Sequence, residues 1–413
     1  MTDRADRRQD RLFVVCLVFA ILAPPIGMFY LPLVPLVALA VKIHIFDATN
    51  SIAFRNDAFF VFLLILLSLI WSILSLLINN LESVEYIITL SRMIAILSVL
   101  WLTIGADRRI SIRSVFQAFV IAAAINATVV FYQMVVITSG LPLPLLRLAD
   151  TFYGAVPYEE SVRAIGLMSG HDSSSLLSLV GFVLTYGQKE VVLLRSRASR
   201  LVVPVFFLLA MVFSGRTGLL LALFYIVAIP FLDRRMALRS SLVVGFGVGG
   251  VAFLFLAGGE YGELLVRRAF SVFISYVETG RVYDYSAADT LQSYSIPTDW
   301  RIYLFGNSLP HFHKFGARSD SGYMQWLYGN GLPVLASLLV CVAYICYLTF
   351  RRLGVHSTFL LLLMMAACIK GPYIFTKITA ELFFSVLIVL SDASRRAKAV
   401  PALGARTRVD VPV

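Results

Sequence analysis

Residues 58–79 read AFFVFLLILLSLIWSILSLLIN, an apolar stretch without a single charged side chain. A helix rises about 1.5 Å per residue, so a helix of this length spans roughly the 30 Å hydrocarbon core of a bilayer. The stretch therefore predicts a transmembrane helix, and similar stretches recur along the chain.

The composition points to the same class. The chain has 413 residues, of which 59% are hydrophobic and 14% are charged, far from the balance of a soluble protein. A soluble protein with large buried helices is the alternative, and the repeated apolar runs exclude it. We predict an all-α fold: a single polytopic integral membrane domain over 1–413.

Hydropathy predicts about twelve transmembrane helices. Each run is about as long as a bilayer crossing needs, although the first two are short. The predicted spans are 12–24, 28–43, 58–79, 84–105, 114–137, 173–187, 201–214, 216–232, 241–257, 323–349, 355–370 and 376–391.

The basic residues predict the orientation, because membrane proteins keep Lys and Arg preferentially on the cytoplasmic side. With the N-terminus inside, most of the 35 basic residues are cytoplasmic, including those of DRRISIR at 107–113 and DRRMALR at 233–239. We expect both termini to be cytoplasmic. The net charge of +11 is then a topology signal, and no soluble basic domain suggests a nucleic-acid partner.

Two predicted outer loops are much longer than the others: the first outer loop at 138–172, and a large loop at 258–322 between the ninth and tenth spans. Both keep basic residues on the side that the charge rule disfavours. Solvated loop charge explains any one of them equally well, but as a group they favour an anion-binding role. They are Arg147, Arg163, Arg267, Arg268, Arg281, Arg301, Lys314 and Arg318.

Several common chemistries have no signal in the chain. No phosphate-binding glycine loop and no nucleophile elbow is present, so we expect no nucleotide cofactor. His311 and His313 lack a third metal ligand, so we expect no metal site. The cysteines all fall within predicted spans and imply no disulfide framework: Cys16, Cys341, Cys346 and Cys368.

Two arginines lie where a charge is costly. Arg216 stands between two apolar runs in MVFSGRTGLLLAL, at 211–223, where flanking Ser-Gly and Thr-Gly pairs predict a polar helix break. An Arg at such a break can hold a phosphate bidentately, although a plain turn with a snorkelling Arg is the alternative. Arg92 lies inside a predicted span, and Glu381 in the last span is its candidate partner.

Four motifs occur in a fixed order: RAIGLMSGHDSSS at 163–175, SGRTG at 214–218, FGNSLP at 305–310 and DSGYMQWLYGNGLPVL at 320–335. Together with the predicted topology, they resemble the Wzy-type polysaccharide polymerases and the related O-antigen ligases. The resemblance covers about 160–340. The ligase-type motif before the tenth span commonly has a His where this chain has Asp320, which favours a polymerase.

The resemblance implies a function at the periplasmic face of the bacterial inner membrane. Such enzymes polymerise oligosaccharide repeat units carried on undecaprenyl diphosphate into surface or secreted polysaccharide. Because lipid diphosphate is already a good leaving group, this glycosyl transfer needs neither a metal nor a cofactor. The implied partners are the lipid-linked oligosaccharides, the bilayer, and chain-length regulator and flippase proteins.

The resemblance also implies residue roles. Arg216 and Arg281 are the expected diphosphate clamps, because developing negative charge on the leaving group needs stabilisation. Asp320, with His311 or His313, is the expected base that takes a proton from the attacking sugar hydroxyl. The other candidates are expected to bind substrate: Arg92, Arg163, His171, Arg318 and Tyr323.

Three other functions remain open at this stage. An O-antigen-type ligase would transfer glycan from the same lipid diphosphate to another acceptor. A flippase or exporter of lipid-linked sugars would line a continuous intramembrane cavity with charges, whereas here the charges gather at one face. A receptor or structural membrane protein would not need arginines at helix breaks.

Overall fold

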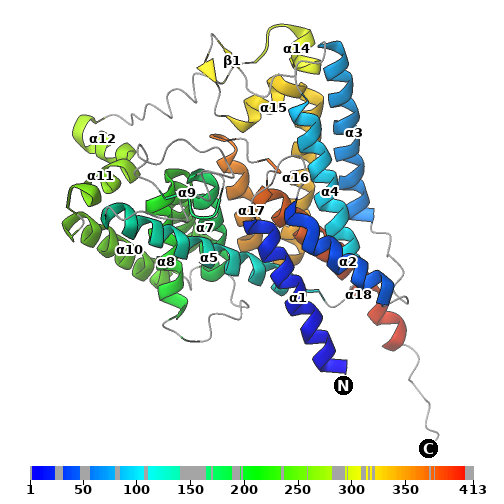
Figure 1. Cartoon of the computed structure of the whole chain (residues 1–413), viewed down its shortest axis with the longest axis horizontal. Helices are drawn as coiled ribbons and strands as arrows, with labels where there is room; N and C mark the ends of the chain where they lie inside the picture. The colour runs from blue at the N-terminus through cyan, green and yellow to red at the C-terminus, as the bar shows by residue number, and fades with distance from the viewer. Residues whose placement is uncertain are drawn as a thin grey trace, which may run out of the picture.

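The computed structural model consists of helices with a short two-stranded ladder (Figure 1). The description covers residues 2–23, 31–46, 56–79, 84–106, 110–139, 164–168, 171–187, 196, 199–233, 237–257, 259–280, 294, 296–307, 313–314, 317–318, 321–371, 374–375 and 377–404.

The elements in chain order begin with α1 (Thr2–Leu22), the 3-10 turn η1 (Leu31–Leu33), α2 (Val34–Phe46), α3 (Asn56–Ile78), α4 (Glu85–Ala106), α5 (Ile112–Ser139) and α7 (His171–Gly187). There follow α8 (Ser199–Ser214), α9 (Arg216–Leu232), α10 (Ala237–Ala257), α11 (Gly259–Ala269), α12 (Ser271–Thr279) and α14 (Trp300–Phe305). The last are β1 (His313–Lys314), β2 (Ala317–Arg318), α15 (Gly322–Asn330), α16 (Leu332–Leu353), α17 (Val355–Ala367) and α18 (Lys377–Gly404).

Each predicted apolar run contains a helix, although the described residues at the ends of some runs lie outside it. Within the described residues, four are long and apolar enough to cross a membrane, and the other apolar helices are shorter. These helices identify a membrane protein by length and composition, and the number of about twelve spans stays a prediction. The four long helices are Asn56–Ile78, Glu85–Gly105, Ile112–Val136 and Leu332–Leu353.

Helix α3 shows how its sequence suits a bilayer. Its inward face carries buried serines at 68, 72 and 75, whereas its opposite face is apolar and exposed. Exposed to water, such an apolar face would favour aggregation. In a bilayer it contacts lipid chains, which are equally apolar. The exposed apolar side chains recur at helical spacing: Leu63, Leu67, Ile70, Leu74 and Leu77.

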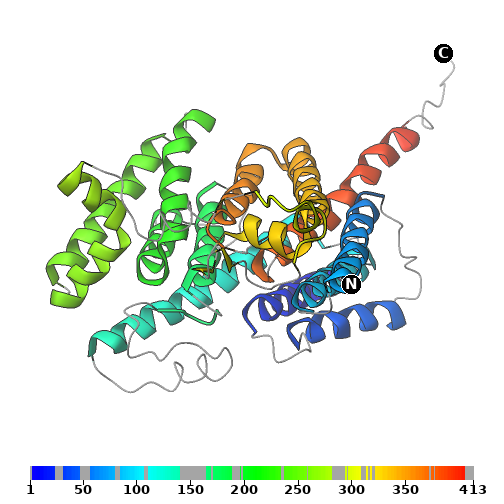
Figure 2. The same ribbon diagram turned by 90° about the horizontal axis from the view of Figure 1, so that it is seen from above.

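Two helices form the interior of the molecule. Every residue from 174 to 186 in α7 and from 378 to 388 in α18 is buried. Helix α7 packs against α5, α8, α9 and α17, and α18 packs against α3, α4, α5 and α16. Figures 1 and 2 show the resulting two groups, with α8–α12 at one end of the molecule and α2–α4 at the other.

The predicted span 323–349 is wrong in one respect, because two helices replace it. Helix α15 ends at Asn330 and α16 begins at Leu332, with Gly331 between them at φ 81°. That left-handed conformation suits glycine, and a Cβ at Gly331 would lie 2.0 Å from the carbonyl oxygen of Leu304. The break therefore brings α15 directly against α14.

The predicted large loop at 258–322 is partly helical. It contains α11, α12 and α14, together with the antiparallel pair β1–β2, in which His313 faces Arg318 and Lys314 faces Ala317. Hydropathy did not reveal these elements because they are short and carry many polar residues. Figure 1 places α14, β1 and α15 at the upper side, opposite the start of α1 and the end of α18.

Polar contacts with α3 fix α14 and α15. Ser72 Oγ donates to Asn330 Oδ1 over 2.7 Å, and the backbone N–H of Asn307 donates to the carbonyl of Tyr328 over 2.6 Å. The first bond ties α15 to α3, and the second joins the FGN sequence at the end of α14 to the YGN sequence at the end of α15. Two of the quoted motifs thus meet in one packed junction.

Candidate functional site

The predicted helix break at Arg216 is present. Helix α8 ends at Ser214 and α9 begins at Arg216, with Gly215 extended between them. The Arg216 side chain is partly buried, and its Nη1 donates to Ser271 Oγ over 2.7 Å. Since Ser271 is the first residue of α12, the segment after α10 folds back onto the helix break.

The first turns of α7 and α9 lie side by side. Ser175 Oγ donates to the carbonyl of Gly215 over 2.7 Å and accepts from the N–H of Gly218 over 2.9 Å. Thr217 Oγ1 donates to Asp172 Oδ1 over 3.1 Å. A Cβ at Gly218 would lie 2.2 Å from Ser175 Oγ, so only glycine permits this approach. The N-termini of two helices, each with a partial positive charge, therefore converge beside Arg216.

A buried polar network holds the segment 164–168 against the bundle. Gln133 Nε2 donates to the carbonyl of Gly166 over 3.0 Å, and the Gly166 N–H donates to Gln133 Oε1 over 2.8 Å. Asn126 Oδ1 accepts from the Leu167 N–H over 2.8 Å, while Asn126 Nδ2 donates to Ser174 Oγ over 2.8 Å. Both amide side chains are fully buried, and Gly166 has φ 63°. The network positions the chain that immediately follows Arg163.

A second polar junction surrounds the end of α17. Three donors satisfy carbonyls that a helix end leaves without intrahelical partners. Burial raises the pKa of the Tyr294 phenol, which keeps that donor protonated at neutral pH. The bonds are Tyr323 Oη to Met365 O (2.8 Å), Gly322 N to Cys368 O (3.0 Å) and Tyr294 Oη to Ile369 O (2.9 Å).

Helix α17 relates the polar junction at its end to the helix break at Arg216. His356, near its start, contacts Tyr225 of α9 across 3.3 Å and lies beside Gly187, the last residue of α7. Because α17 packs against both α7 and α9, it runs back toward the first turns of those helices. Its end, with the bond to Tyr323, therefore lies on the Arg216 side of the bundle.

The expected pairing of Arg92 with Glu381 is wrong. Helices α4 and α18 pack together, but no ion pair joins these two described residues. Glu381 is fully buried toward the bundle interior, whereas Arg92 lies on a partly exposed side of α4 and its Nε has no hydrogen-bond partner. Ser385 Oγ, one turn beyond Glu381, is likewise buried without a partner.

The remaining candidates differ in how far the structure describes them. His171 is the first residue of α7. His313 and Arg318 are paired backbone positions in the two-stranded ladder. Tyr323 lies in α15, with its hydroxyl turned to α17 rather than to an open site. Four candidates lie outside the described residues: Arg163, Arg281, His311 and Asp320.

Several residues of this site were not predicted from sequence. Asn126 and Gln133 are two amides seven residues apart on one face of an apolar helix, a pattern that marks a polar contact but not its partner. Ser271, the partner of Arg216, had no sequence signal. Across the described residues, no three His, Cys, Asp or Glu side chains group to hold a metal ion, and the four cysteines are buried and form no disulfide.

Comparison with known proteins adds no family assignment. No protein-family model matches the chain, and no curated protein is significantly similar to it.

Proposed function

We propose that this protein is a polysaccharide polymerase of the inner membrane, with about twelve spans and both termini in the cytoplasm. It transfers a growing glycan from undecaprenyl diphosphate to a sugar hydroxyl of the next lipid-linked repeat unit, at the periplasmic face. The observation that carries the proposal is Arg216, which stands at a glycine-flanked helix break where the first turns of α7 and α9 converge.

The chemistry of the leaving group matches that observation. As the glycosidic bond to diphosphate breaks, negative charge accumulates on the phosphate oxygens, and fixed cationic groups lower the energy of that state. Arg216 supplies a planar donor pair, and two helix N-termini supply partial positive charge around it. In this proposal Arg281 is the second cation, and Arg163, next to the segment held by Gln133, contacts the phosphate or sugar.

The attacking hydroxyl must lose its proton as the new bond forms, and a base within hydrogen-bond reach takes it. Asp320 is the proposed base because it immediately precedes the junction of α15 with α17. His311 and His313 are the alternative bases in the same stretch. His171 at the start of α7, Arg318, Tyr323 and Arg92 are proposed to position the sugars.

The first test is Arg216→Lys in cells that make the polymer. Lys keeps the charge but lacks the planar fork, so polymer formation should fall on the order of a hundredfold, the usual loss of one donor to a developing anion. The matched control is Arg351→Lys near the end of α16, an exposed Arg whose Nη1 donates to Tyr347 Oη over 3.1 Å. It should make normal polymer at equal protein abundance. Normal polymer from Arg216→Lys would reduce Arg216 to a turn residue.

The intermediates that accumulate distinguish the alternatives. In a deletion strain, single repeat units on the lipid indicate a polymerase, whereas full-length chains stranded on the lipid indicate an O-antigen-type ligase. Lipid-linked units that stay on the cytoplasmic face indicate a flippase or exporter. Unchanged lipid-linked glycans and surface polymer would refute all three.

A further inference from the structure

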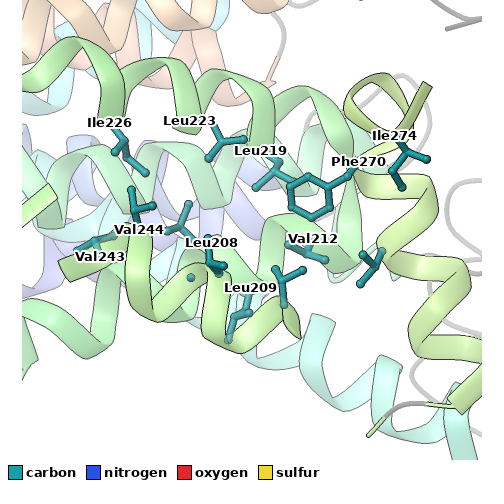
Figure 3. A pocket seen from close by; sticks show the side chains of 14 residues that line it. Leu208, Leu209, Val212, Leu219, Leu223, Ile226, Val243, Val244, Phe270 and Ile274 are labelled. Carbon is teal, nitrogen blue, oxygen red and sulfur yellow. The ribbon is translucent and has the colours of Figure 1, made fainter. Parts of the chain in front are cut away.

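An apolar pocket of about 310 Å³ lies among α8, α9, α10, the end of α11 and the start of α12. Its lining contains no polar side chain. In Figure 3, Phe270 and Ile274 lie at one end, and Ile226 and Val243 lie at the other. The floor and walls also include Leu208, Leu209, Val212, Leu219, Leu223 and Val244.

One end of this pocket adjoins the cation of the candidate site. Leu219 follows Arg216 by one helical turn, and Phe270 immediately precedes Ser271, which accepts the hydrogen bond from Arg216. The lining continues along α9 to Ile226, seven residues or about 10 Å beyond Leu219. The pocket and the guanidinium together form an elongated apolar space with a positive charge at its mouth.

We propose that this pocket holds the hydrocarbon chain of a single-chain lipid diphosphate while Arg216 binds its phosphate groups. The inference rests on the proposed function and names where its donor lipid lies. The positive charge of Arg216 favours a lipid with an anionic head group over one with a neutral head group. The pocket volume corresponds to roughly ten water-sized groups at about 30 Å³ each, enough for the chain segment nearest the head but not for a peptide helix about 10 Å wide.

The energetics assign different tasks to the two parts. A lipid chain in the bilayer is already in hydrocarbon, so entering the pocket gains it little hydrophobic free energy. The phosphate contacts with Arg216 therefore supply the attraction, and the pocket holds the chain where its head group can reach Arg216, so a chain that is kept out of the pocket cannot bring its head group to that site. Holding the chain there aligns the bond between diphosphate and sugar with the incoming hydroxyl.

The hydrogen bond to Ser271 takes part in binding. In the described structure, Ser271 Oγ occupies one donor of Arg216 at a distance of 2.7 Å. A phosphate oxygen competes for the same donor, and a charged acceptor bonds an Arg more strongly than a hydroxyl does. Binding of the lipid therefore releases the start of α12 from α9.

Gly247 on α10 offers a direct test, because it lines the pocket and the nearest atom to an added Cβ is Leu208 Cδ1 at 3.7 Å. Gly247→Phe places a ring into the pocket. Gly249→Phe is the matched control, since Gly249 lies on the same helix outside the lining and has open space around its Cβ position. Gly247→Leu serves in place of Phe if the larger side chain lowers protein abundance.

The assay is equilibrium binding to the purified full-length protein in lipid nanodiscs, with undecaprenyl diphosphate, uncharged undecaprenol and inorganic diphosphate as probes. We expect Gly247→Phe to lower the affinity for undecaprenyl diphosphate at least tenfold, and Gly249→Phe to change that affinity less than twofold. Inorganic diphosphate should bind weakly, with the same affinity for Gly247→Phe and Gly249→Phe. Its binding should be lost in Arg216→Gln. Ser271→Ala should bind the lipid diphosphate at least as tightly as the wild-type protein.

Each contrary result has a defined meaning. Wild-type affinity in Gly247→Phe places the chain elsewhere and overturns the inference, even if polymer formation still depends on Arg216. Equal affinity for undecaprenol means that any bilayer hydrocarbon fills the pocket, which also overturns it. Lipid binding that depends on both Arg216 and Gly247, in a protein that makes no polymer, supports the pocket and refutes the proposed function.

Discussion

Gln133 is the residue whose replacement tests how the candidate site is positioned. Its side chain holds Gly166 through two hydrogen bonds. Gln133 Oε1 accepts from the Gly166 N–H over 2.8 Å, and Gln133 Nε2 donates to the Gly166 carbonyl over 3.0 Å. Gln133→Leu has similar size but makes neither bond. Because Gly166 is buried, its backbone N–H and carbonyl would then both lack a partner.

The size of the effect follows from those two groups. Each unsatisfied buried backbone group costs about 1–3 kcal/mol, so the segment 164–168 is weakened by roughly 2–6 kcal/mol. Because the segment is short and lies outside the helices, the cost appears as easier local opening and not as unfolding of the bundle. At about 1.4 kcal/mol per factor of ten, a loss of about 3 kcal/mol accelerates opening on the order of a hundredfold.

Hydrogen–deuterium exchange on purified protein measures that opening at Gly166 and Leu167. Exchange there should be about a hundredfold faster in Gln133→Leu. The control is Thr128→Val on the same helix, because Thr128 bonds only its own helix at the carbonyl of Ala124, over 2.8 Å. Exchange within threefold of wild type in Gln133→Leu would show that other contacts hold the segment and would remove the reason for placing Arg163 at the site.

Three further predictions test the fold, the orientation and the base. Gly331 and Gly354 both have φ 81°, but only a Cβ at Gly331 would meet the Leu304 carbonyl. Gly331→Ala should therefore fail to accumulate, whereas Gly354→Ala should lose only about 1–2 kcal/mol of stability in thermal unfolding. Equal stability of the two variants would refute the crowding at Gly331. A cysteine at Ser196 in a cysteine-less variant should resist membrane-impermeant labelling of intact cells, and labelling there overturns the predicted orientation. Asp320→Asn should stop polymer formation while lipid-linked substrate still binds, whereas normal polymer together with an inactive His313→Gln would move the base to the histidine.

The sequence predicted where the apolar helices lie, because long apolar runs without charges are easily recognised, but it missed the short helices α11, α12 and α14. The helix break at Arg216 was also predictable, since Ser-Gly and Thr-Gly pairs interrupt an otherwise continuous apolar run. The division at Gly331 was missed, although GNGLP at 329–333 is a turn signal, because the apolar residues on both sides keep the mean hydropathy of the run high. Hydropathy averages over many residues and does not register a single left-handed backbone conformation.

The contacts of the site were largely beyond prediction. The bonds of Gln133 to Gly166 and of Arg216 to Ser271 join residues 33 and 55 positions apart, and a local pattern reports the donor without its acceptor. The apolar pocket depends on how α8 to α12 pack, and each of its leucines and valines alone resembles an ordinary lipid-facing residue. The Arg92–Glu381 pairing failed for the same reason, because helix packing decides which side chains face each other.

The enclosure of α18 has a consequence for biogenesis. Helix α18 follows every other described helix, yet its residues 378–388 lie in the interior and the helix contacts α3, α4, α5 and α16. A ribosome therefore delivers the surrounding helices to the membrane before the one that fills the space between them. Until α18 arrives, α3, α4, α5 and α16 lack the interior helix that they share, so this part of the bundle closes late and a nascent chain that stops near residue 376 cannot complete it.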